Sequence, residues 1–430
     1  MNDIESLYRI FLSSNGISTD TRQLRKGMLF FALKGTNFDA NTLIPKALEF
    51  GADWAVSDDS AYLDHEKVLV VDDSLKTLQL LAAYHRQQMK AKVIAITGTN
   101  GKTTTKELVS RVLEQRFNVV STQGNLNNHI GVPLSLLRIT EETEIAVIEM
   151  GANHQGEIMQ LCRIAQPDFG IITNIGKAHL EGFGSLTGVI NAKSELYNWI
   201  DDHGELVFVH SDNELLEGLS MNIKRFTYGE SLNDDPYGEL VSVDPWLHIA
   251  WEYKQLQYVV RTNMIGAYNT ENILAAIALG CFFEVDGDKI NHAIEHYIPS
   301  NNRSQLIETA TNRVILDAYN ANPVSMAAAI RNFEQIHGPK PVLILGDMLE
   351  LGQNSDEEHA EILKLIIDLD FKHVYLVGPL FGNVYTGDDW HHFQHVDQLV
   401  AYLKKHPIKN ADILVKASRG IRLENVVPLL

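Results

Sequence analysis

The chain has 430 residues, which exceeds the usual size of one hydrophobic core and predicts about three domains. Its hydrophobic content of 45% is typical of a globular protein, and 36 basic against 55 acidic residues give a net charge of −19. This charge argues against a general binder of nucleic acids or anionic membranes, because their phosphate groups are bound by basic patches.

The first 90 residues are predicted to form a small α/β domain of their own. Short apolar runs bounded by turn residues indicate strands, and the apolar spacing of LKTLQLLAAYHR indicates a helix that closes the unit. The expected strands are residues 28–33, 54–57 and 68–71, and the expected helix is residues 75–86.

The segment at residues 97–105, TGTNGKTTT, predicts a phosphate-binding loop. It follows an apolar strand pattern at residues 93–97 and precedes a helical pattern at residues 107–113. Its spacing departs from GxxxxGK[ST], because Ile96 stands where the first glycine would be. An ordinary strand-to-helix turn is the alternative, but Gly-Lys-Thr-Thr at a helix start favours nucleotide binding.

Each residue type in this loop has a physical reason to be there. Gly98 and Gly101 let backbone N–H groups surround phosphate oxygens, and Lys102 adds a positive charge. The hydroxyl of Thr103 is a suitable ligand for Mg²⁺.

Strands then alternate with helices, which predicts a doubly wound parallel sheet in a central domain, residues 91–298. The strands expected there are residues 93–97, 145–149, 170–173 and 206–209. Between residues 228 and 265 the pattern changes to a small antiparallel region. Its expected strands are residues 247–253 and 257–262, and a helix is expected at residues 269–280.

A linker near residues 299–302 introduces a second α/β domain, residues 299–430. Four apolar runs there indicate buried strands and two periodic stretches indicate helices. The expected strands are residues 314–317, 342–345, 374–377 and 413–415, and the helices are residues 325–336 and 357–368.

The sequence also favours a soluble cytoplasmic protein without membrane insertion. Cys162 and Cys281 are its only cysteines, too few for a disulfide framework. Residues 1–5 are acidic and lack the layout of a signal peptide. No apolar run approaches the roughly 20 residues that span a bilayer.

Several residues that follow predicted strands are candidates for chemistry, because ligands of open α/β sheets bind at the carboxyl ends of strands. Glu149 is placed to hold Mg²⁺ or, alternatively, to face water. His179 and Glu181 follow another strand; a metal role for the histidine and a structural one both stay open. Asp317 ends a strand of the last domain in the same way as Glu149.

Other candidates have an ordinary explanation beside the functional one. Lys193 has the pattern of a solvated surface lysine, and Asn269 and Asn272 are typical caps of a helix start. Arg303 is the only basic residue of the linker and a candidate for a phosphate clamp. The histidine cluster is expected to lie at the surface without a metal; its members are His391, His392 and His395.

Taken together, these segments resemble the Mur ligase family, ATP-dependent peptide ligases of bacterial cell-wall synthesis. The similar motifs occur in the same order over nearly the whole chain. They are residues 97–106 (TGTNGKTTTK), 124–133 (GNLNNHIGVP), 149–158 (EMGANHQGEI), 172–181 (ITNIGKAHLE), 316–326 (LDAYNANPVSM) and 345–352 (LGDMLELG).

The resemblance implies an α/β protein of three domains. A small N-terminal α/β domain would bind the UDP part of the substrate, and a central doubly wound parallel sheet would carry the phosphate loop and bind ATP. A C-terminal Rossmann-like α/β domain would close on ATP and bind a dipeptide. The chain is expected to be a monomer.

The implied reaction joins D-alanyl-D-alanine to UDP-N-acetylmuramoyl-tripeptide through an acyl phosphate, the last cytoplasmic step of peptidoglycan precursor synthesis. One alternative is a family member that adds a different amino acid. Such a member typically carries Asp-Asn-Pro-Arg where this chain has GDMLE at residues 346–350. The other is an unrelated phosphotransferase with the same kind of loop.

The resemblance also implies roles for individual residues, with ATP and two Mg²⁺ as cofactors. Lys102, His179 and Lys193 would be catalytic; Thr103 and Glu149 would hold one Mg²⁺, and His179 with a carbamylated Lys193 the second. ATP would contact Gly98, Thr99, Asn100, Gly101, Lys102, Thr103, Thr104, Asn269, Asn272, Arg303 and Asp317, with Lys416 moving inward on closure. The UDP part of the substrate would contact Thr19, Asp20, Arg22, Lys34, Gly35 and Asn37, and the muramyl-peptide part would contact Asn125, Asn127 and Asn128.

Three positions depart from the family's usual pattern. Asp39-Ala40-Asn41 replaces Asp-Gly-His, which predicts altered uridine contacts. Asn302 replaces a glycine before Arg303, and Ala417 replaces a glycine in Lys-Gly-Ser-Arg. The extra methyl group of Ala417 is expected to perturb a close backbone approach.

Overall fold

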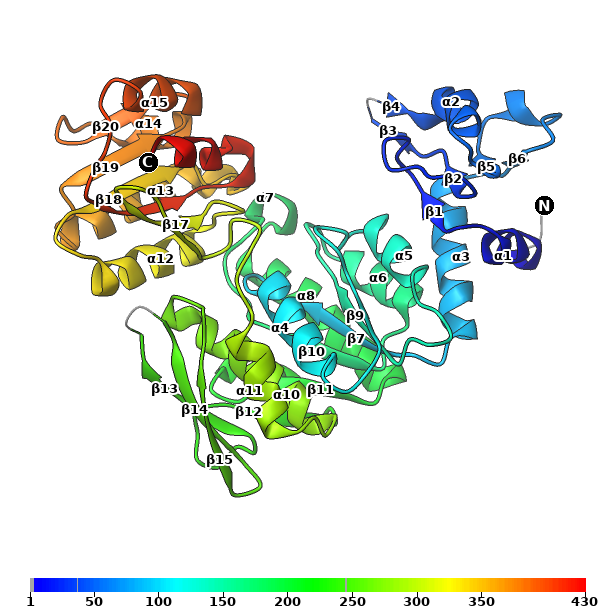
Figure 1. The fold of residues 1–430 in the computed structure, drawn as a ribbon, viewed down its shortest axis with the longest axis horizontal. Helices are drawn as coiled ribbons and strands as arrows, with labels where there is room; N and C mark the ends of the chain where they lie inside the picture. The colour runs from blue at the N-terminus through cyan, green and yellow to red at the C-terminus, as the bar shows by residue number, and fades with distance from the viewer. Residues whose placement is uncertain (1–3, 37, 244–245) are drawn as a thin grey trace.

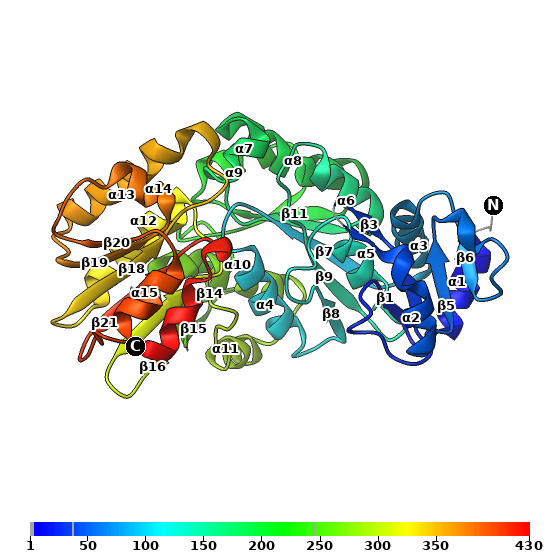
Figure 2. The same cartoon turned by 90° about the horizontal axis from the view of Figure 1, so that it is seen from above.

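The computed structural model describes residues 4–36, 38–243 and 246–430 and arranges them in three parts, each built around its own sheet (Figure 1). The central part, cyan to green, lies between the blue N-terminal part and the yellow-to-red C-terminal part (Figure 2). Within these residues, none of the helices has the length and apolar character that a bilayer crossing demands. The domain boundaries at residues 90 and 298 stay predictions, because the positions of helices and strands alone do not fix them.

The N-terminal part is a parallel sheet of order β1-β2-β5-β6. Its three predicted strands and its closing helix are confirmed, whereas two-residue strands were too short to leave a sequence pattern. Helix α3 also packs against α5 (Gly131–Leu136) and α6 (Glu157–Ala165) of the central part, which ties the two parts together. The elements are α1 Ile4–Ser13, β1 Ile17–Ser18, β2 Leu29–Phe31, β3 Lys34–Gly35, β4 Phe38–Asp39, α2 Ile44–Glu49, β5 Trp54–Ser57, β6 Val68–Val70 and α3 Ser74–Gln88.

The central sheet is parallel throughout, with strand order β12-β11-β10-β7-β9-β8. Its inner strands are buried on both faces because helices cover each side, which is why they read as continuous apolar runs. The elements are β7 Lys92–Thr97, α4 Lys102–Leu113, β8 Val119–Ser121, α5 Gly131–Leu136, β9 Ile145–Glu149, α6 Glu157–Ala165, β10 Phe169–Ile172, α7 Leu180–Phe183, α8 Leu186–His203, β11 Leu206–His210, α9 Glu214–Ser220 and β12 Arg225–Tyr228.

The predicted antiparallel region is a three-stranded sheet of order β13-β14-β15. Two of its strands were predicted; β13 was not, because its residues are mostly half-exposed and its apolar pattern is weak. The sheet shares a core with α10, which packs along α4. The elements are β13 Tyr237–Ser242, β14 His248–Tyr253, β15 Leu256–Arg261, α10 Thr270–Phe282 and α11 Gly287–Glu295.

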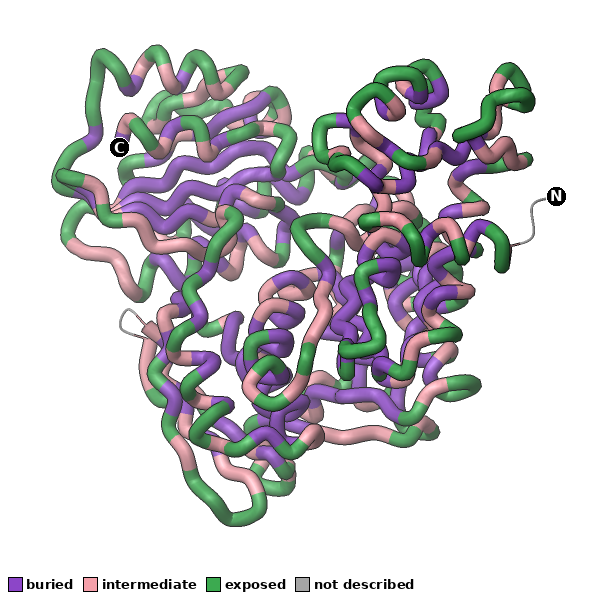
Figure 3. Tube along the Cα trace, turned by 45° about the vertical axis from the view of Figure 1, so that its right-hand side comes forward, coloured by how far each residue is buried: buried purple, intermediate pink, exposed green. Residues whose placement is uncertain are grey.

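The C-terminal sheet has the order β16-β17-β21-β18-β19-β20, with only β16 antiparallel. Figure 3 shows its inner strands buried along most of their length. The four predicted strands are these inner ones, whereas the missed strands β16 and β20 form the less buried edges. The elements are β16 Gln305–Glu308, β17 Arg313–Asp317, α12 Pro323–Ile336, β18 Pro341–Gly346, α13 Ser355–Asp368, β19 His373–Val377, α14 Pro379–Val384, β20 His391–Phe393, α15 Val396–Leu403 and β21 Asp412–Lys416.

Candidate active site

A cavity of about 600 Å³ lies between the central and C-terminal parts. Its walls come from the loops that follow β7, β9 and β10, from the start of α10, and from the segment around β17. These loops are at the carboxyl ends of parallel strands, where open α/β sheets bind ligands. The volume is in the range of small-molecule sites.

The phosphate-binding loop is formed by backbone geometry that requires glycine. Gly98 has φ 144° and Gly101 has φ 79°. A Cβ atom at Gly98 would lie 2.0 Å from Thr173 Oγ1, and one at Gly101 would lie 2.3 Å from Asn272 Oδ1. Gly101 is also the N-cap of α4 and offers no side chain to the first N–H groups of that helix. These donors are therefore available to an anion.

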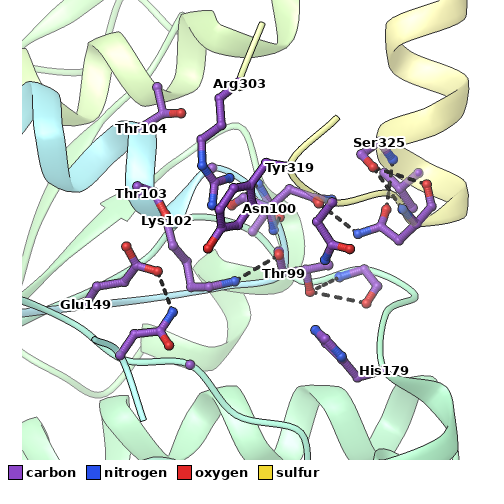
Figure 4. A pocket seen from close by; sticks show the side chains of 18 of the residues that line it. Thr99, Asn100, Lys102, Thr103, Thr104, Glu149, His179, Arg303, Tyr319 and Ser325 are labelled. Atoms are coloured by element: carbon purple, nitrogen blue, oxygen red, sulfur yellow. Dashed lines mark hydrogen bonds between the residues drawn. The ribbon is translucent and has the colours of Figure 1, made fainter. Parts of the chain in front are cut away.

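Lys102 is held at this loop by its own neighbours. Its amine donates to the carbonyl oxygen of Gly98 at 2.6 Å and to that of Thr99 at 3.0 Å, the second of which is drawn in Figure 4. Burial lowers the pKa of Lys102 to about 8; the nearby carboxylate of Glu149 opposes this shift and the charge of Arg303 adds to it. A bound polyphosphate would favour the ammonium form, since an adjacent negative charge raises the pKa of an amine.

Glu149 has the burial and the free carboxylate oxygen expected of a cation ligand. It is only 1% exposed, which excludes the water-facing alternative. Its Oε1 accepts a hydrogen bond of 2.7 Å from Asn127 Nδ2, but its buried Oε2 has no hydrogen-bond partner among the described residues. An unpartnered buried carboxylate oxygen is costly. With the buried Thr103 on the same cavity, this pair fits a hard cation such as Mg²⁺.

His179 lies in the loop before α7 and lines the cavity. Figure 4 shows its ring directed into the cavity below the phosphate-binding loop. Its buried Nδ1 contacts the carboxylate of Glu350 from the C-terminal part, and this contact lowers the pKa of Glu350. Glu181 follows in α7, where its backbone N–H approaches the Glu350 carbonyl oxygen at 3.5 Å.

Lys193 is buried, so the interpretation as a solvated surface lysine is wrong. It lies on α8 and is 2% exposed, because this face of the amphipathic helix packs against the core. Its amine is 5.5 Å from the ring centre of Phe183, and the His179 ring is 6.4 Å from that ring. Burial, reinforced by the charge of Lys102, lowers the pKa of Lys193 to about 7. Lys193 is not among the residues that line the cavity.

Asn269 and Asn272 do not cap α10 with their side chains. Asn269 donates to the Ile265 carbonyl oxygen at 2.8 Å and accepts from Asn272 Nδ2 at 2.9 Å. Asn272 Oδ1 accepts from Thr105 Oγ1 at 2.9 Å. Both asparagines line the cavity, and Asn272 connects α10 to the helix that follows the phosphate loop.

The C-terminal wall contains the remaining predicted nucleotide residues. The Arg303 guanidinium lies 3.8 Å from the centre of the Tyr319 ring. Asp317 accepts from the Ser304 N–H at 3.2 Å and pairs with the buried amine of Lys416 at 2.5 Å. The linker therefore positions Arg303 on the cavity wall, where Lys416 also lies.

Two of the three departures from the family pattern, Asn302 and Ala417, fit the local backbone conformation and the space left by neighbouring residues. Asn302 has φ 58°, the left-handed conformation that a glycine would adopt and that asparagine tolerates. Ala417 is fully buried, and its methyl group faces Gly346, where a Cβ would lie 2.7 Å away. The missing side chain of Gly346 thus provides the space that the Ala417 methyl group occupies.

The third departure from the family pattern, at Asn41, is buried and hydrogen-bonded within the N-terminal part. Asn41 is 2% exposed and donates to Asp39 and Asp58, each at 2.8 Å. Its Oδ1 accepts from Ser57 Oγ at 2.7 Å. The amide is therefore engaged within the fold.

The predicted substrate residues fall in two places. Asn127 and Asn128 line the cavity, whereas Asn125 does not. The N-terminal residues lie away from the cavity: Thr19, Asp20, Arg22, Lys34 and Gly35. Asn37 lies outside the described residues. In the N-terminal group, Arg22 pairs with Asp20 at 2.6 Å and Lys34 with Asp58 at 2.9 Å.

Sequence reasoning missed polar residues that join the two walls. Asn322 Nδ2 donates to Asn100 Oδ1 at 2.8 Å, and the Asn100 N–H donates to Asn174 Oδ1 at 2.9 Å. Tyr319 supports Arg303. Tyr319 and Asn322 are part of the segment at residues 316–326, whose similarity to the family was the available signal.

The histidine cluster is at the surface, as predicted. His391 and His395 are exposed and His392 is half-buried. Among the described residues, no group of three or more His, Cys, Asp or Glu side chains is arranged to hold a metal ion. A cation in the cavity would therefore also depend on hydroxyl, water or phosphate oxygens.

Comparison with known proteins extends the similarity to the whole chain. Residues 96–280 match the Mur ligase middle domain, and residues 302–420 match the glutamate ligase domain of Mur ligases. The UDP-N-acetylmuramoyl-tripeptide–D-alanyl-D-alanine ligase of Bacillus subtilis strain 168 is 37% identical over 425 residues, covering 96% of this chain and 92% of that protein. The enzyme of the same name from Escherichia coli K12 is 34% identical over 427 residues, covering 97% and 94%.

Solved structures agree with the predicted α/β fold of three domains. A crystal structure of MurF from Acinetobacter baumannii is similar with a TM-score of 0.87 at 31% identity, covering 99% of this chain and 97% of that one. MurF ligase from Thermotoga maritima, solved in complex with ADP, is similar with a TM-score of 0.84 at 25% identity, covering 100% and 98%. The chain belongs to the Mur ligase family.

Proposed function

We propose that this chain is an ATP-dependent ligase that joins D-alanyl-D-alanine to UDP-N-acetylmuramoyl-tripeptide. The observation that carries the proposal is the cavity, in which Gly101, Lys102 and the unpartnered Oε2 of Glu149 form a site for a polyphosphate with a cation. Identity to ligases of this specificity over almost the whole chain supports the choice of substrates. The reaction completes a UDP-muramoyl-pentapeptide, a peptidoglycan precursor, and we place it in the cytoplasm.

In the first step, a carboxylate oxygen of the tripeptide attacks the γ-phosphorus of ATP, which forms an acyl phosphate and releases ADP. Both reactants are anions, so their repulsion contributes to the barrier. Lys102 and the free N–H groups at the start of α4 reduce this repulsion. Mg²⁺, when held by Thr103 and Glu149, would add positive charge at the phosphate oxygens.

In the second step, the amine of D-alanyl-D-alanine attacks the acyl carbon, the amide bond forms, and phosphate leaves with the bonding electrons. The amine loses a proton in this step. Arg303, Asp317 and Lys416 lie on the C-terminal wall, and closure of that part would bring them onto the nucleotide. Asn269 and Asn272, which also line the cavity, are proposed to contact the adenine side of ATP.

Lys193 is proposed to carry a carbamate, which would supply an oxygen ligand to a second Mg²⁺ held together with His179. A neutral amine adds CO₂ and releases one proton, so the reaction requires a lysine that is deprotonated near neutral pH. The pKa of about 7 and the burial of Lys193 meet this requirement. An oxygen ligand is also what Mg²⁺ prefers.

The rest of the substrate is assigned to the two other groups of residues. Asn125, Asn127 and Asn128 would face the muramyl-peptide part. The UDP part would be held by Thr19, Asp20, Arg22, Lys34 and Gly35. The chain is proposed to work as a monomer, with domains at residues 1–90, 91–298 and 299–430.

The test is a ligation assay with the purified chain, ATP, Mg²⁺, the UDP-linked tripeptide and D-alanyl-D-alanine, read by product mass. We expect the pentapeptide product with equal amounts of ADP and phosphate. Competition by single amino acids tests the dipeptide specificity. Absence of the pentapeptide at all Mg²⁺ concentrations, from protein that still binds ATP, would overturn the proposal.

A further inference from the structure

A carboxylate from the C-terminal part reaches the histidine of the cavity. Glu350 lies in the loop after β18, and its side chain contacts the buried Nδ1 of His179. His179 itself lies on the cavity wall, in the loop between β10 and α7. The carboxylate lies against Nδ1 as a charge contact without hydrogen-bond geometry, so Nε2 is the ring nitrogen left for a ligand in the cavity.

Both residues of this contact have an uncommon backbone conformation. His179 has φ 51° and Glu350 has φ 66°, the left-handed region that residues other than glycine rarely adopt. Such conformations persist where the surrounding structure fixes them, and they concentrate at functional sites. Here two of them meet across the boundary between the central and C-terminal parts.

A second ion pair crosses the same boundary nearby. Lys177 pairs with Glu358 of α13 at 2.8 Å. Figures 1 and 2 both show α7, which begins next to His179, beside the C-terminal part. The Lys177–Glu358 pair therefore joins the same two parts without contacting the histidine, which makes it a reference for the Glu350 contact, with a carboxylate that is more buried, 5% against 55% exposed.

We infer that Glu350 is a positioning residue that orients the His179 ring, so that Nε2 presents its lone pair to a cation in the cavity. The inference rests on the proposed function, in which His179 is a ligand of Mg²⁺. A carboxylate beside the far nitrogen of a histidine ligand favours the tautomer that carries its proton on that nitrogen and restricts the orientation of the ring. Because Glu350 comes from the C-terminal part, the metal site becomes complete only when that part is in place.

The exposure of the Glu350 side chain distinguishes a positioning role from a contact that only stabilises the boundary between the two parts. The Glu350 side chain is 55% exposed, and an ion pair so open to water adds little to stability. Removing its charge should therefore leave the fold intact and change the histidine.

The experiment measures Mn²⁺ binding to the full chain with ADP by electron paramagnetic resonance, alongside the ligation assay and thermal unfolding. We expect Glu350→Gln to weaken Mn²⁺ binding by about tenfold, with an unchanged unfolding midpoint. The reference Glu358→Gln, which removes the other ion pair across the boundary, should leave Mn²⁺ affinity at the wild-type value. In a His179→Asn background, the effect of Glu350→Gln should disappear, because the carboxylate acts through the ring.

Equal losses of Mn²⁺ affinity in Glu350→Gln and Glu358→Gln would overturn the inference in favour of bracing between the parts. So would a Glu350→Gln effect that persists in the His179→Asn background, or unaltered Mn²⁺ binding in Glu350→Gln. Each of these results leaves the proposed function standing if the wild type makes the pentapeptide. Failure of the wild type to do so would instead count against the proposed function.

Discussion

The two walls of the cavity are built in different ways. On the central wall, the phosphate loop is fixed by the backbone of a few consecutive residues, with Gly98 and Gly101 at positive φ. On the C-terminal wall, side chains from separate segments hold one another, as in the Arg303–Tyr319 stack and the Asp317–Lys416 pair. The first wall is complete within one part of the chain, whereas the second depends on how the C-terminal part is placed.

This difference predicts which wall mainly determines nucleotide binding and which mainly determines stability. A loop shaped by its backbone binds phosphate without help from distant residues, so changes there should weaken nucleotide binding or slow the reaction. In a wall assembled from side chains, a single substitution should change nucleotide affinity little. It should instead lower the stability of the C-terminal part or hinder its closure. The following predictions test that division, from the largest expected effect to the smallest.

Lys102→Met should cause the largest loss. It removes the charge that we propose faces the phosphates of ATP, and we expect kcat to fall by about a hundredfold to a thousandfold. The ligation assay measures this, with circular dichroism to show that the variant is folded. Turnover near the wild-type rate would contradict the assigned role of the loop.

Gly101→Ala should weaken ATP binding by about tenfold or more, because the new Cβ meets Asn272 and φ 79° costs about 1–2 kcal/mol for alanine. Gly156→Ala is the matched control. Gly156 has φ 86° but open space around its Cβ position, so only the backbone cost remains. Calorimetric titration with ATP should separate the two variants; similar affinities would show that contact with Asn272 does not matter.

Asp317→Asn should destabilise the C-terminal part by about 3 kcal/mol, because it leaves the buried amine of Lys416 without its partner. Replacing Lys416 with Met in the same protein removes the unpaired charge and should recover much of the loss. Denaturant unfolding of the single and double variants measures the difference. A double variant no more stable than the single one would contradict a cost due to the buried charge.

Lys193→Met should raise stability, with a dependence on pH that follows from the lowered pKa. In a CO₂-free, metal-free buffer below pH 7, Lys193 is charged in both states and its burial opposes folding. Between pH 7 and the ordinary value of 10.5, the folded state loses the proton first and the penalty declines. The gain from Lys193→Met should therefore be largest below pH 7 and vanish above 10.5.

Unfolding of both proteins across this range measures the gain. The same variant should lose ligase activity, and a short carboxylic acid that replaces the carbamate should restore part of it. A variant as active as wild type without the acid would refute the metal role of Lys193.

The parts of the site that sequence predicted are those encoded locally. The strand before Gly98 and the helix after Lys102 follow from apolar spacing, and the glycines between them follow from backbone requirements. Glu149 was found because it ends a buried strand. In each case a few neighbouring residues carry the information.

The missed features depend on tertiary structure. Nothing in the residues around Lys193 distinguishes a surface lysine from a buried one, because burial depends on what α8 packs against. The contacts of Glu350 with His179 and of Asn322 with Asn100 join residues far apart in the chain. The edge strands β16 and β20 are short and half-exposed, so their apolar pattern is weak.

The separation of the two groups of proposed substrate residues has one more consequence. Asp20, Arg22 and Lys34 belong to the N-terminal part, while Asn127 and Asn128 line the cavity beyond it. A ligand anchored at its nucleotide end by the first group can place its carboxylate at the phosphate loop only if the span between its two ends is right. The enzyme would then select its substrate by length, and peptides one residue too short or too long would be rejected before any chemistry begins.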